Sequence, residues 1–508
     1  MMVTKPVTPT STRLDGDRKP VDLRLIRILL IGVFSLGFLP RLFWGFWTDE
    51  AGTYWMAIAG WQAAIQRTVN WAGQSVLYSI LESLFAIKGP GQELLLRVPS
   101  VIAVVVAAWQ LKRVAELSIH RSAGWLAVLP FVCTPDITEF GTSARPYALA
   151  LAASLGSFRY LLEWQELDEQ QLSRWRTLAK YLAASVLTLY LHYLFGFIFV
   201  IQGAYLAFCR ARGRRTGLAL PLASLIVLPV SLLPVLHSLR VTAKTTEDFA
   251  HAAKPALSQL FQICFPPLLL LGAGLGVLML LASARNMKWR PLPMRPEHAF
   301  LVLTWLTLAP VSFFVVARFT ENSIFAARYL LFTVPAFSLV IAWAAAGLER
   351  QEGRLTLLVA LFAASILHPG MLMRTFRESP ASWRPPLEQI AHASQTHPAP
   401  LFIASGMANS GGLRWKECDP ATSSLYSPLT AYPIANRTIP LPYQFFPGVQ
   451  EYIRGKMQAE LSQEPELLLL AASDSELARW MSGYLKQLGY RPETHNFNDF
   501  VVVDFRRP

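Results

Sequence analysis

Charged residues are scarce in this sequence of 508 residues. Only 16% are Asp, Glu, Lys or Arg, whereas 53% are hydrophobic, and the mean hydropathy is +0.35. A typical soluble domain is about 25% charged. The shortage of charge, together with long uncharged runs, excludes the soluble, disordered and collagen-like classes of protein. A multi-pass membrane protein remains.

Cysteine and the common catalytic motifs are also scarce. The four cysteines lie far apart in the sequence, and this spacing predicts neither a disulfide framework nor a CxxC metal site. The C-terminal region contains no Gly-rich phosphate loop, no G-x-S-x-G motif and no His/Cys set with metal-ligand spacing. We therefore expect neither redox chemistry nor a structural zinc ion.

Long apolar runs are what the sequence has instead. A helix of about 20 residues crosses the roughly 30 Å of bilayer hydrocarbon. The run 178–209 is longer than one span needs, and we expect it to divide at His192-Tyr193 into two short helices. Together the runs predict about eleven transmembrane helices. The other runs are 23–46, 97–115, 122–136, 143–163, 217–238, 258–283, 299–317, 327–347 and 355–373.

Basic residues predict the orientation, because cytoplasmic loops carry an excess of Lys and Arg. If the flexible N-terminal segment 1–22 is cytoplasmic, every second loop is basic, and 47–96 lies on the outer side. An odd number of spans then places the tail, 374–508, on that side too. The net charge of +13 therefore belongs to the part before the tail, 1–373, that is, to the segment 1–22 and the membrane part 23–373, where it is a topology signal and does not indicate nucleic-acid binding.

The tail differs from the rest of the chain in composition. It is polar, rich in Pro and Ser, and has no run long enough to cross a membrane. Short β-like runs alternate with helical patterns, which predicts a small extracytoplasmic α/β domain. The β-like runs are 400–405, 466–472 and 499–505, and the helical patterns are 384–394, 447–463 and 474–488.

The most informative segment, 40–60, follows the first predicted span. Here two adjacent carboxylates, Asp49 and Glu50, lie among tryptophan and tyrosine residues. One interpretation is an aromatic interfacial belt with two solvated acids. The other is a catalytic carboxylate at the membrane surface, where a lipid-linked substrate presents its headgroup. Amphipathic segments at 53–66 and 74–88 follow, with the periodicity of helices that lie in the interface.

Six stretches stand out by their order and spacing over about residues 25–350. They are the Asp-Glu pair, NWAGQSVLYSIL, LLRVPS, 139-EFGTSARPYALAL-151, 188-TLYLHYLFG-196 and 327-ARYLLFTVPAF-337. In this order they resemble the dolichyl-phosphate-mannose-protein mannosyltransferase-like group of GT-C glycosyltransferases, which includes the glycosyltransferase family 39 and aminoarabinose transferases acting on lipid A. The resemblance implies a GT-C fold. One difference is Ser75-Val76, where relatives often have paired prolines.

The resemblance implies transfer of a sugar from a polyprenyl-phosphate donor to a hydroxyl acceptor, with inversion, at the outer face of the cytoplasmic membrane. It implies that Asp49 is the base that accepts the acceptor's proton, whereas retention would need a second, nucleophilic group. Glu50 could orient Asp49, act on it as a neighbouring like charge, or face water. We predict no cofactor or metal, although Asp136 and Glu139 could bind a divalent ion as in oligosaccharyltransferase-like relatives.

The departing phosphate needs fixed positive partners. Arg145 and Arg328 are preferred because each lies at the outer end of a predicted span and is closely followed by a tyrosine. Such arginines can also simply snorkel to lipid headgroups. His192 could pack between helices or hydrogen-bond phosphate or sugar, and the resemblance favours the second role. The predicted donor-binding residues are Arg145, Tyr147, His192, Arg328, Tyr329, Tyr54 and Lys88.

Two other functions stay open at this stage. A transporter or lipid flippase usually places ionisable groups near the bilayer midplane, whereas Asp49, Arg145 and Arg328 all fall at outer ends of spans. A glycan polymerase or ligase would carry its catalytic groups in a large late outer loop, whereas the loop 318–326 is short. The expected partners are the lipid-linked donor, membrane lipids and a lipid, glycan or protein acceptor.

Overall fold

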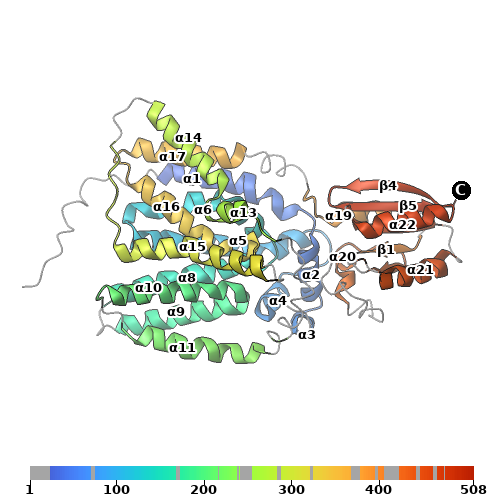
Figure 1. Cartoon of the computed structure of the whole chain (residues 1–508), viewed down its shortest axis with the longest axis horizontal. Coiled ribbons are helices and arrows are strands. Elements are labelled where there is room, and N and C mark those ends of the chain that lie inside the picture. Colours follow the sequence, from blue (N-terminus) through green and yellow to red (C-terminus); the bar gives the residue numbers. More distant parts are fainter. Residues whose placement is uncertain are drawn as a thin grey trace, which may run out of the picture.

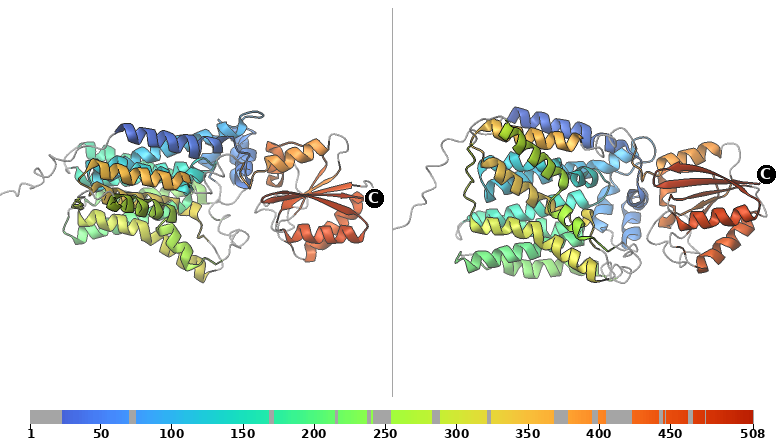
Figure 2. Two further views of the ribbon diagram at one scale, coloured as in Figure 1. Left: turned by 90° about the horizontal axis from the view of Figure 1, so that it is seen from above. Right: turned by 45° about the horizontal axis from the view of Figure 1, so that its top comes forward.

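A helical bundle and a sheet domain lie end to end along the longest axis of the molecule (Figures 1 and 2). The helices of segment 47–96, called the first outer loop after its predicted side, lie between them. The computed structural model describes residues 23–69, 75–167, 172–214, 217–236, 240, 254–282, 288–320, 324–367, 378–394, 399–404, 423–441, 445, 447–461, 466–473 and 475–507. The predicted cytoplasmic segment 1–22 lies outside these residues.

The bundle is apolar on its outer surface as well as in its core. Ile28, Val105, Leu225 and Leu278 are more than half exposed, as expected of helices whose outer face contacts lipid. The chain is thus a helical membrane protein. The bundle helices are α1 (Leu23–Val33), α5 (Gln92–Ser118), α6 (Gly124–Val132), α7 (Pro135–Gly141), α8 (Tyr147–Glu166), α9 (Leu172–Leu191), α10 (Ile198–Ala211), α11 (Ala219–Leu232), α13 (Leu257–Cys264), α14 (Pro267–Ala282), α15 (Pro296–Phe319), α16 (Val334–Ala346) and α17 (Gln351–Leu367).

Fewer of the described helices than the sequence predicts are long and apolar enough to count as transmembrane spans. Within the described ranges, four helical segments are long and apolar enough to cross a membrane, and the bent pair formed by α13 and α14 is a possible fifth. Other apolar helices, such as α16 with 13 residues, are shorter than the usual span of about 17–25 residues. The count of about eleven therefore stays a prediction.

The division of the run 178–209 occurs at the predicted place. Helix α9 ends at Leu191, and His192 has an extended backbone with φ −157° and ψ 110°. A short 3₁₀ turn, Tyr193–Phe197, then leads into α10. The break places the His192 ring at an irregular backbone position within the bundle.

The described residues of the first outer loop, 47–69 and 75–96, form three helices before α5 instead of the two predicted segments. They are α2 (Thr48–Ala57), α3 (Trp61–Val69) and α4 (Val76–Glu82). Helix α2 begins before the predicted 53–66 segment, so that Asp49 and Glu50 lie in its first turn. Acidic side chains are favoured there by the exposed N–H groups and the helix dipole. The chain turns after α2 at Gly60, which has a φ of +90°.

The tail forms the predicted α/β domain. Its helices are α19 (Arg384–Ala393), α20 (Ser427–Ala431), α21 (Pro447–Leu461) and α22 (Glu476–Gln487). The strands are β1 (Leu401–Ile403), β2 (Thr438–Pro440), β3 (Glu466–Ala472), β4 (Arg491–Phe497) and β5 (Phe500–Arg506), in the order β2-β1-β3-β5-β4. Strands β2, β1 and β3 are parallel, and β5 runs antiparallel to β3 and β4.

Each face of the sheet packs against a different partner. Alternate residues of a strand point to opposite faces. Leu467 and Leu469 therefore share a core with α21 and α22, whereas Leu468 and Leu470 face Trp383 of the segment that enters α19. This second core also contains Phe46, Ala51, Tyr54, Leu96 and Ala144 from the membrane part. The sheet domain and the first outer loop are therefore parts of one hydrophobic core.

Trp383 connects the two parts of this shared core. Its ring lies 4.2 Å from that of Phe500, and its indole N–H donates to the Thr48 hydroxyl oxygen at 3.2 Å. We expect Trp383→Ala to lower the free energy of unfolding by about 3–5 kcal/mol, as for other buried aromatic residues. Thermal unfolding of the purified protein measures this.

Trp61→Ala is the matched control, because this tryptophan in α3 is 55% exposed. We expect it to change the melting temperature only slightly. If Trp383→Ala and Trp61→Ala lowered the melting temperature equally, this result would contradict a shared core that joins the sheet domain to the outer loop.

Candidate functional site

Asp49 lies between two arginines that are distant in sequence. Its Oδ2 atom is 3.9 Å from Nη2 of Arg145 and 3.9 Å from Nη1 of Arg328. The Asp49 side chain is 33% exposed, so a ligand can reach the carboxylate. The structure thus brings together the predicted base and both predicted phosphate-binding arginines.

Each arginine is held by its own surroundings. Arg145, just before α8, donates from Nη1 to the Asp49 carbonyl oxygen at 3.5 Å and to the Thr53 hydroxyl at 3.4 Å. Arg328, in the 3₁₀ turn Ala327–Tyr329, donates to the Tyr329 hydroxyl at 3.4 Å and stacks on the Tyr329 ring. These contacts orient both guanidinium groups toward Asp49.

Aromatic side chains form the inner wall of the site. The His192 ring lies 5.3 Å from that of Tyr147 and 5.8 Å from that of Tyr329, between ring centres. Two buried nitrogens here, Nδ1 of His192 and Nε of Arg328, make no hydrogen bond with any described residue. Buried polar atoms of this kind are usually paired. Both nitrogens therefore stay unpaired beside the guanidinium groups, and arginine is well suited to bind an oxyanion such as phosphate.

Glu50 does not face water, which corrects one of the interpretations drawn from the sequence. Its side chain is 1% exposed, and its Oε1 accepts hydrogen bonds from Nε of Arg97 at 2.8 Å and from the Ala144 amide at 2.7 Å. The other oxygen, Oε2, accepts from Nη2 of Arg97. Consecutive helix residues point in different directions, and Asp49 therefore stays open while Glu50 is buried.

Arg97 is the important residue that sequence reasoning missed. It lies within the LLRVPS stretch, in α5, and its guanidinium group is buried against Glu50. It also donates to the carbonyl oxygens of Arg41 at 2.8 Å, Trp44 at 2.6 Å and Gly45 at 3.3 Å. Two features of the sequence could have indicated this role. Arg97 is a single arginine within an apolar run, and the pair Asp49 and Glu50 had no identified partner.

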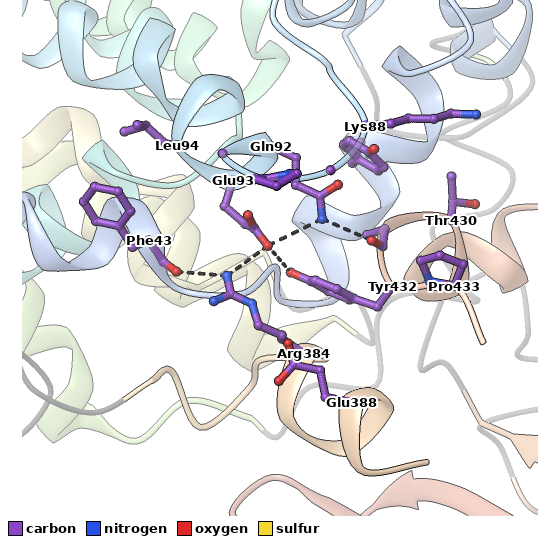
Figure 3. Close-up of a pocket in the computed structure, with 15 residues that line it drawn as sticks. Phe43, Lys88, Gln92, Glu93, Leu94, Arg384, Glu388, Thr430, Tyr432 and Pro433 are labelled. Atoms are coloured by element: carbon purple, nitrogen blue, oxygen red, sulfur yellow. Dashed lines mark hydrogen bonds and ion pairs between the residues drawn. The ribbon is translucent and has the colours of Figure 1, made fainter. Parts of the chain in front are cut away.

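Tyr54 and Lys88 are not in the Asp49 site. Both line a cavity of about 510 Å³ between the first outer loop and the sheet domain (Figure 3). The Tyr54 hydroxyl donates to the Ile87 carbonyl oxygen at 2.9 Å. On the floor of this cavity, Glu93 accepts a hydrogen bond from the Tyr432 hydroxyl at 2.9 Å and pairs with Nη2 of Arg384 at 2.9 Å.

A second buried acid, Glu82, lies at the end of α4 near the site. It is fully buried, and neither of its carboxyl oxygens makes a hydrogen bond within the described part of the chain. Burial raises the pKa of Glu82 to about 8, and the nearby Glu50 carboxylate adds to this shift. Glu82 is therefore uncharged at neutral pH.

Among the described residues, side chains that could bind a metal ion do not cluster at the Asp49 site or at the interdomain cavity. No group of three His, Cys, Asp or Glu side chains converges among the residues that the structure describes. Asp136 and Glu139 both lie in α7.

Comparison with known proteins identifies the fold. No model of a known protein family and no curated protein matches the sequence. Solved structures do match. ArnT from Cupriavidus metallidurans in the apo state covers 95% of this chain and 97% of its own, with a TM-score of 0.58 and 12% identity. ArnT bound to undecaprenyl phosphate has the same coverage and identity and a TM-score of 0.57.

A third structure is similar over less of its own length. It is the archaeal oligosaccharyltransferase AglB from Archaeoglobus fulgidus, in complex with an inhibitory peptide and a dolichol-phosphate. The match covers 88% of this chain and 69% of that chain, with a TM-score of 0.44 and 12% identity. The likeness to ArnT over nearly the whole length confirms the expected fold, a GT-C membrane bundle followed by a small sheet domain.

The buried pair of Glu50 and Arg97 generates a prediction about stability. Glu50→Gln leaves the Arg97 guanidinium buried without its counter-charge, and we expect it to lower the free energy of unfolding by about 3–5 kcal/mol. The double variant Glu50→Gln, Arg97→Met should recover part of this loss. Thermal and denaturant unfolding measure both effects.

The exposed pair of Glu166 and Arg295 supplies the control. Both side chains are nearly half exposed, and removing such a pair costs at most about 1 kcal/mol. Glu166→Gln should therefore be close to neutral. If Glu50→Gln lowered the free energy of unfolding as little as Glu166→Gln does, this result would contradict the central role of the buried pair.

Glu82 predicts how stability varies with pH. The unfolded chain loses the proton near pH 4.5, whereas the folded protein keeps it to about pH 8. In this window the folded state binds more protons, and its stability therefore falls as the pH rises through the window. Glu82→Gln stays uncharged, so we expect its melting temperature to fall less between about pH 5 and about pH 9.

Glu388→Gln is the control, since Glu388 is exposed at the rim of the interdomain cavity. It should follow the wild-type pH dependence. Identical pH profiles for Glu82→Gln and the wild type would show that Glu82 does not hold its proton in the folded protein.

Proposed function

We propose that the protein is a glycosyltransferase that moves a sugar from a polyprenyl-phosphate donor to a hydroxyl acceptor. The observation that carries this proposal is the open Asp49 carboxylate between Arg145 and Arg328. The fold adds support, because ArnT has been solved with undecaprenyl phosphate bound. The two features together fit a reaction that needs one base and a cationic site for a lipid-linked phosphate.

The chemistry assigns one task to each group. The acceptor hydroxyl attacks the anomeric carbon from the face opposite the phosphate, and Asp49 takes the proton from that hydroxyl. The bond between the anomeric carbon and the phosphate oxygen breaks, and its electron pair leaves with the lipid phosphate. Arg145 and Arg328 stabilise the charge that develops on this phosphate. A single displacement of this kind inverts the anomeric centre.

The position of the site favours an enzyme over a transporter or flippase. Asp49 is in α2 and Arg145 precedes α8 at one end of the bundle, near the sheet domain (Figure 1). A transporter would be expected to hold such charges near the middle of the bilayer. In the topology that the basic loops predict, this end of the bundle is extracytoplasmic, where the donor's headgroup would be presented.

Asp49→Asn tests the proposal. The amide keeps the shape of the side chain but accepts no proton, and loss of a general base typically costs about 10²–10⁴-fold in rate. The measurement is release of lipid phosphate from donor in purified membranes, together with mass spectrometry of envelope glycans from cells with and without the active protein. A sugar that is present in cells with the active protein and missing from cells without it identifies the donor and the acceptor.

Asp499→Asn is the matched control, because this aspartate is exposed in the β4–β5 turn of the sheet domain. Both variants should reach the membrane at the wild-type level. Full activity in Asp49→Asn would remove the base assignment, and unchanged envelope glycans without the protein would remove the proposed function itself.

A further inference from the structure

A cluster of basic and aromatic side chains lies on three bundle helices, away from the candidate site. Helix α8 begins beside that site at Tyr147. Arg159 follows about 18 Å further along the helix, toward the end of the bundle that is remote from the sheet domain (Figure 1). The cluster consists of Trp109 on α5, Arg159 and Tyr160 on α8, and Lys180 on α9.

Arg159 is the most firmly held member of the cluster. Its guanidinium carbon lies 4.4 Å from the centre of the Trp109 ring and 5.1 Å from that of the Tyr160 ring. Its Nε donates to Oε1 of Glu163 at 2.7 Å, and its Nη1 donates to the Gln110 side-chain oxygen at 3.2 Å. The remaining nitrogen, Nη2, donates to no residue in the described part of the chain. A fixed guanidinium group with an unused donor suits a phosphate oxygen.

Lys180 brings a second positive charge to the same ring. Its Nζ lies 5.8 Å from the centre of the Tyr160 ring. Lys180 is exposed and pairs with no carboxylate among the described residues. Glu163 therefore balances one of the two cations, and one positive charge is left. Such a charge is costly beside the membrane interior, and an anion bound between Arg159 and Lys180 lowers this cost.

The cluster is built on a closely packed part of the bundle. One turn before Arg159, an added Cβ at Gly156 would lie 3.6 Å from the Ala184 Cβ of α9 and 3.6 Å from the Gln110 side-chain nitrogen of α5. The three helices thus meet at this level. A basic residue that merely reaches toward lipid headgroups has a free, extended side chain, whereas the Arg159 side chain is 14% exposed and makes two hydrogen bonds.

The surroundings of the cluster match the two parts of a phospholipid. Trp109 is half exposed, and tryptophan and tyrosine gather where membrane and water meet, at the level of the lipid headgroups. Lys180, Ala183 and Leu187 follow one another on one exposed face of α9. This face continues from the cations toward the other end of the bundle as an apolar surface. Cations and an adjoining apolar face together suit a headgroup and its acyl chain.

We propose that Arg159 and Lys180, with Trp109 and Tyr160, bind the phosphate of an anionic phospholipid of the bilayer, whose acyl chain lies along α9. The site does not depend on the proposed function, because it requires only that the bundle lies in a membrane.

A phospholipid bound there joins α5, α8 and α9 at one level. The same three helices position groups of the candidate site: Arg97 lies in α5, Arg145 precedes α8, and His192 follows α9. The lipid therefore stabilises the helices on which the candidate site is built.

The test measures lipid binding to the full-length protein from nanodiscs of equal parts phosphatidylglycerol and phosphatidylcholine, by native mass spectrometry. We expect the double variant Arg159→Gln, Lys180→Gln to weaken binding of phosphatidylglycerol by about tenfold or more. Binding of phosphatidylcholine, which has no net charge, should not change. Glu163→Gln removes the competing carboxylate and should strengthen binding of phosphatidylglycerol several-fold.

The matched control is Arg210→Gln, Arg212→Gln. These two exposed arginines lie at the end of α10 and contact no aromatic ring in the described part of the chain. The control removes the same charge and should bind phosphatidylglycerol as the wild type does. An equal loss in both double variants would show general attraction to basic residues and would overturn the site.

Two further results would also overturn the proposal. One is a wild-type protein that does not prefer phosphatidylglycerol to phosphatidylcholine. The other is unchanged binding in Arg159→Gln, Lys180→Gln. Should this variant fail to fold, Lys180→Gln alone replaces it, because Lys180 is exposed. We expect several-fold weaker binding in the single variant, and wild-type binding there would contradict the site.

Discussion

The buried ion pair between Glu50 and Arg97 is the interaction on which the site depends. Arg97 comes from α5 and donates to backbone carbonyls of the segment that leads into α2. Glu50, in the first turn of α2, accepts from the Ala144 amide, next to Arg145. One pair therefore fixes the helix that carries Asp49 and the turn that carries Arg145. Removing two charges from water is costly, and this cost is offset here because nearly every polar atom of the pair has a hydrogen-bond partner.

The sheet domain completes this support from the opposite side. The Phe46 amide donates to the Tyr432 hydroxyl at 2.7 Å, and the Trp383 amide donates to the Phe46 carbonyl oxygen at 3.0 Å. Residues 45–48 are thus held between α5 and the tail, immediately before Asp49. Since Phe46 and Tyr54 also belong to the core of the sheet, the domain is part of the framework of the site. Lys88 of the outer loop and residues of the tail such as Arg384 line the interdomain cavity where the two parts meet (Figure 3).

Much of the architecture could be predicted from local patterns. The apolar runs predicted a membrane bundle because a helix surrounded by lipid must be apolar on its outer face. The alternation of short apolar runs and helical patterns located β1, β3, β5, α19, α21 and α22. Strands β2 and β4 were missed: β2 has one buried apolar residue, Ile439, and β4 is a polar edge strand whose exposure gives no strong alternation. Its formation depends on pairing with β5 through the turn at Asn498, which has a φ of 52°.

The sequence by itself determined the membrane bundle, the sheet domain and the break at His192, and it singled out Asp49, Arg145 and Arg328 as a predicted site. These follow from periodicity, from charge at the ends of apolar runs, and from motifs that lie within short stretches. Only the tertiary structure decided which charges meet. It paired Glu50 with Arg97, left Asp49 open between Arg145 and Arg328, and moved Tyr54 and Lys88 to the domain interface. The reason is physical: an ion pair is selected by distance and burial between elements remote in sequence, and local residue patterns contain neither quantity.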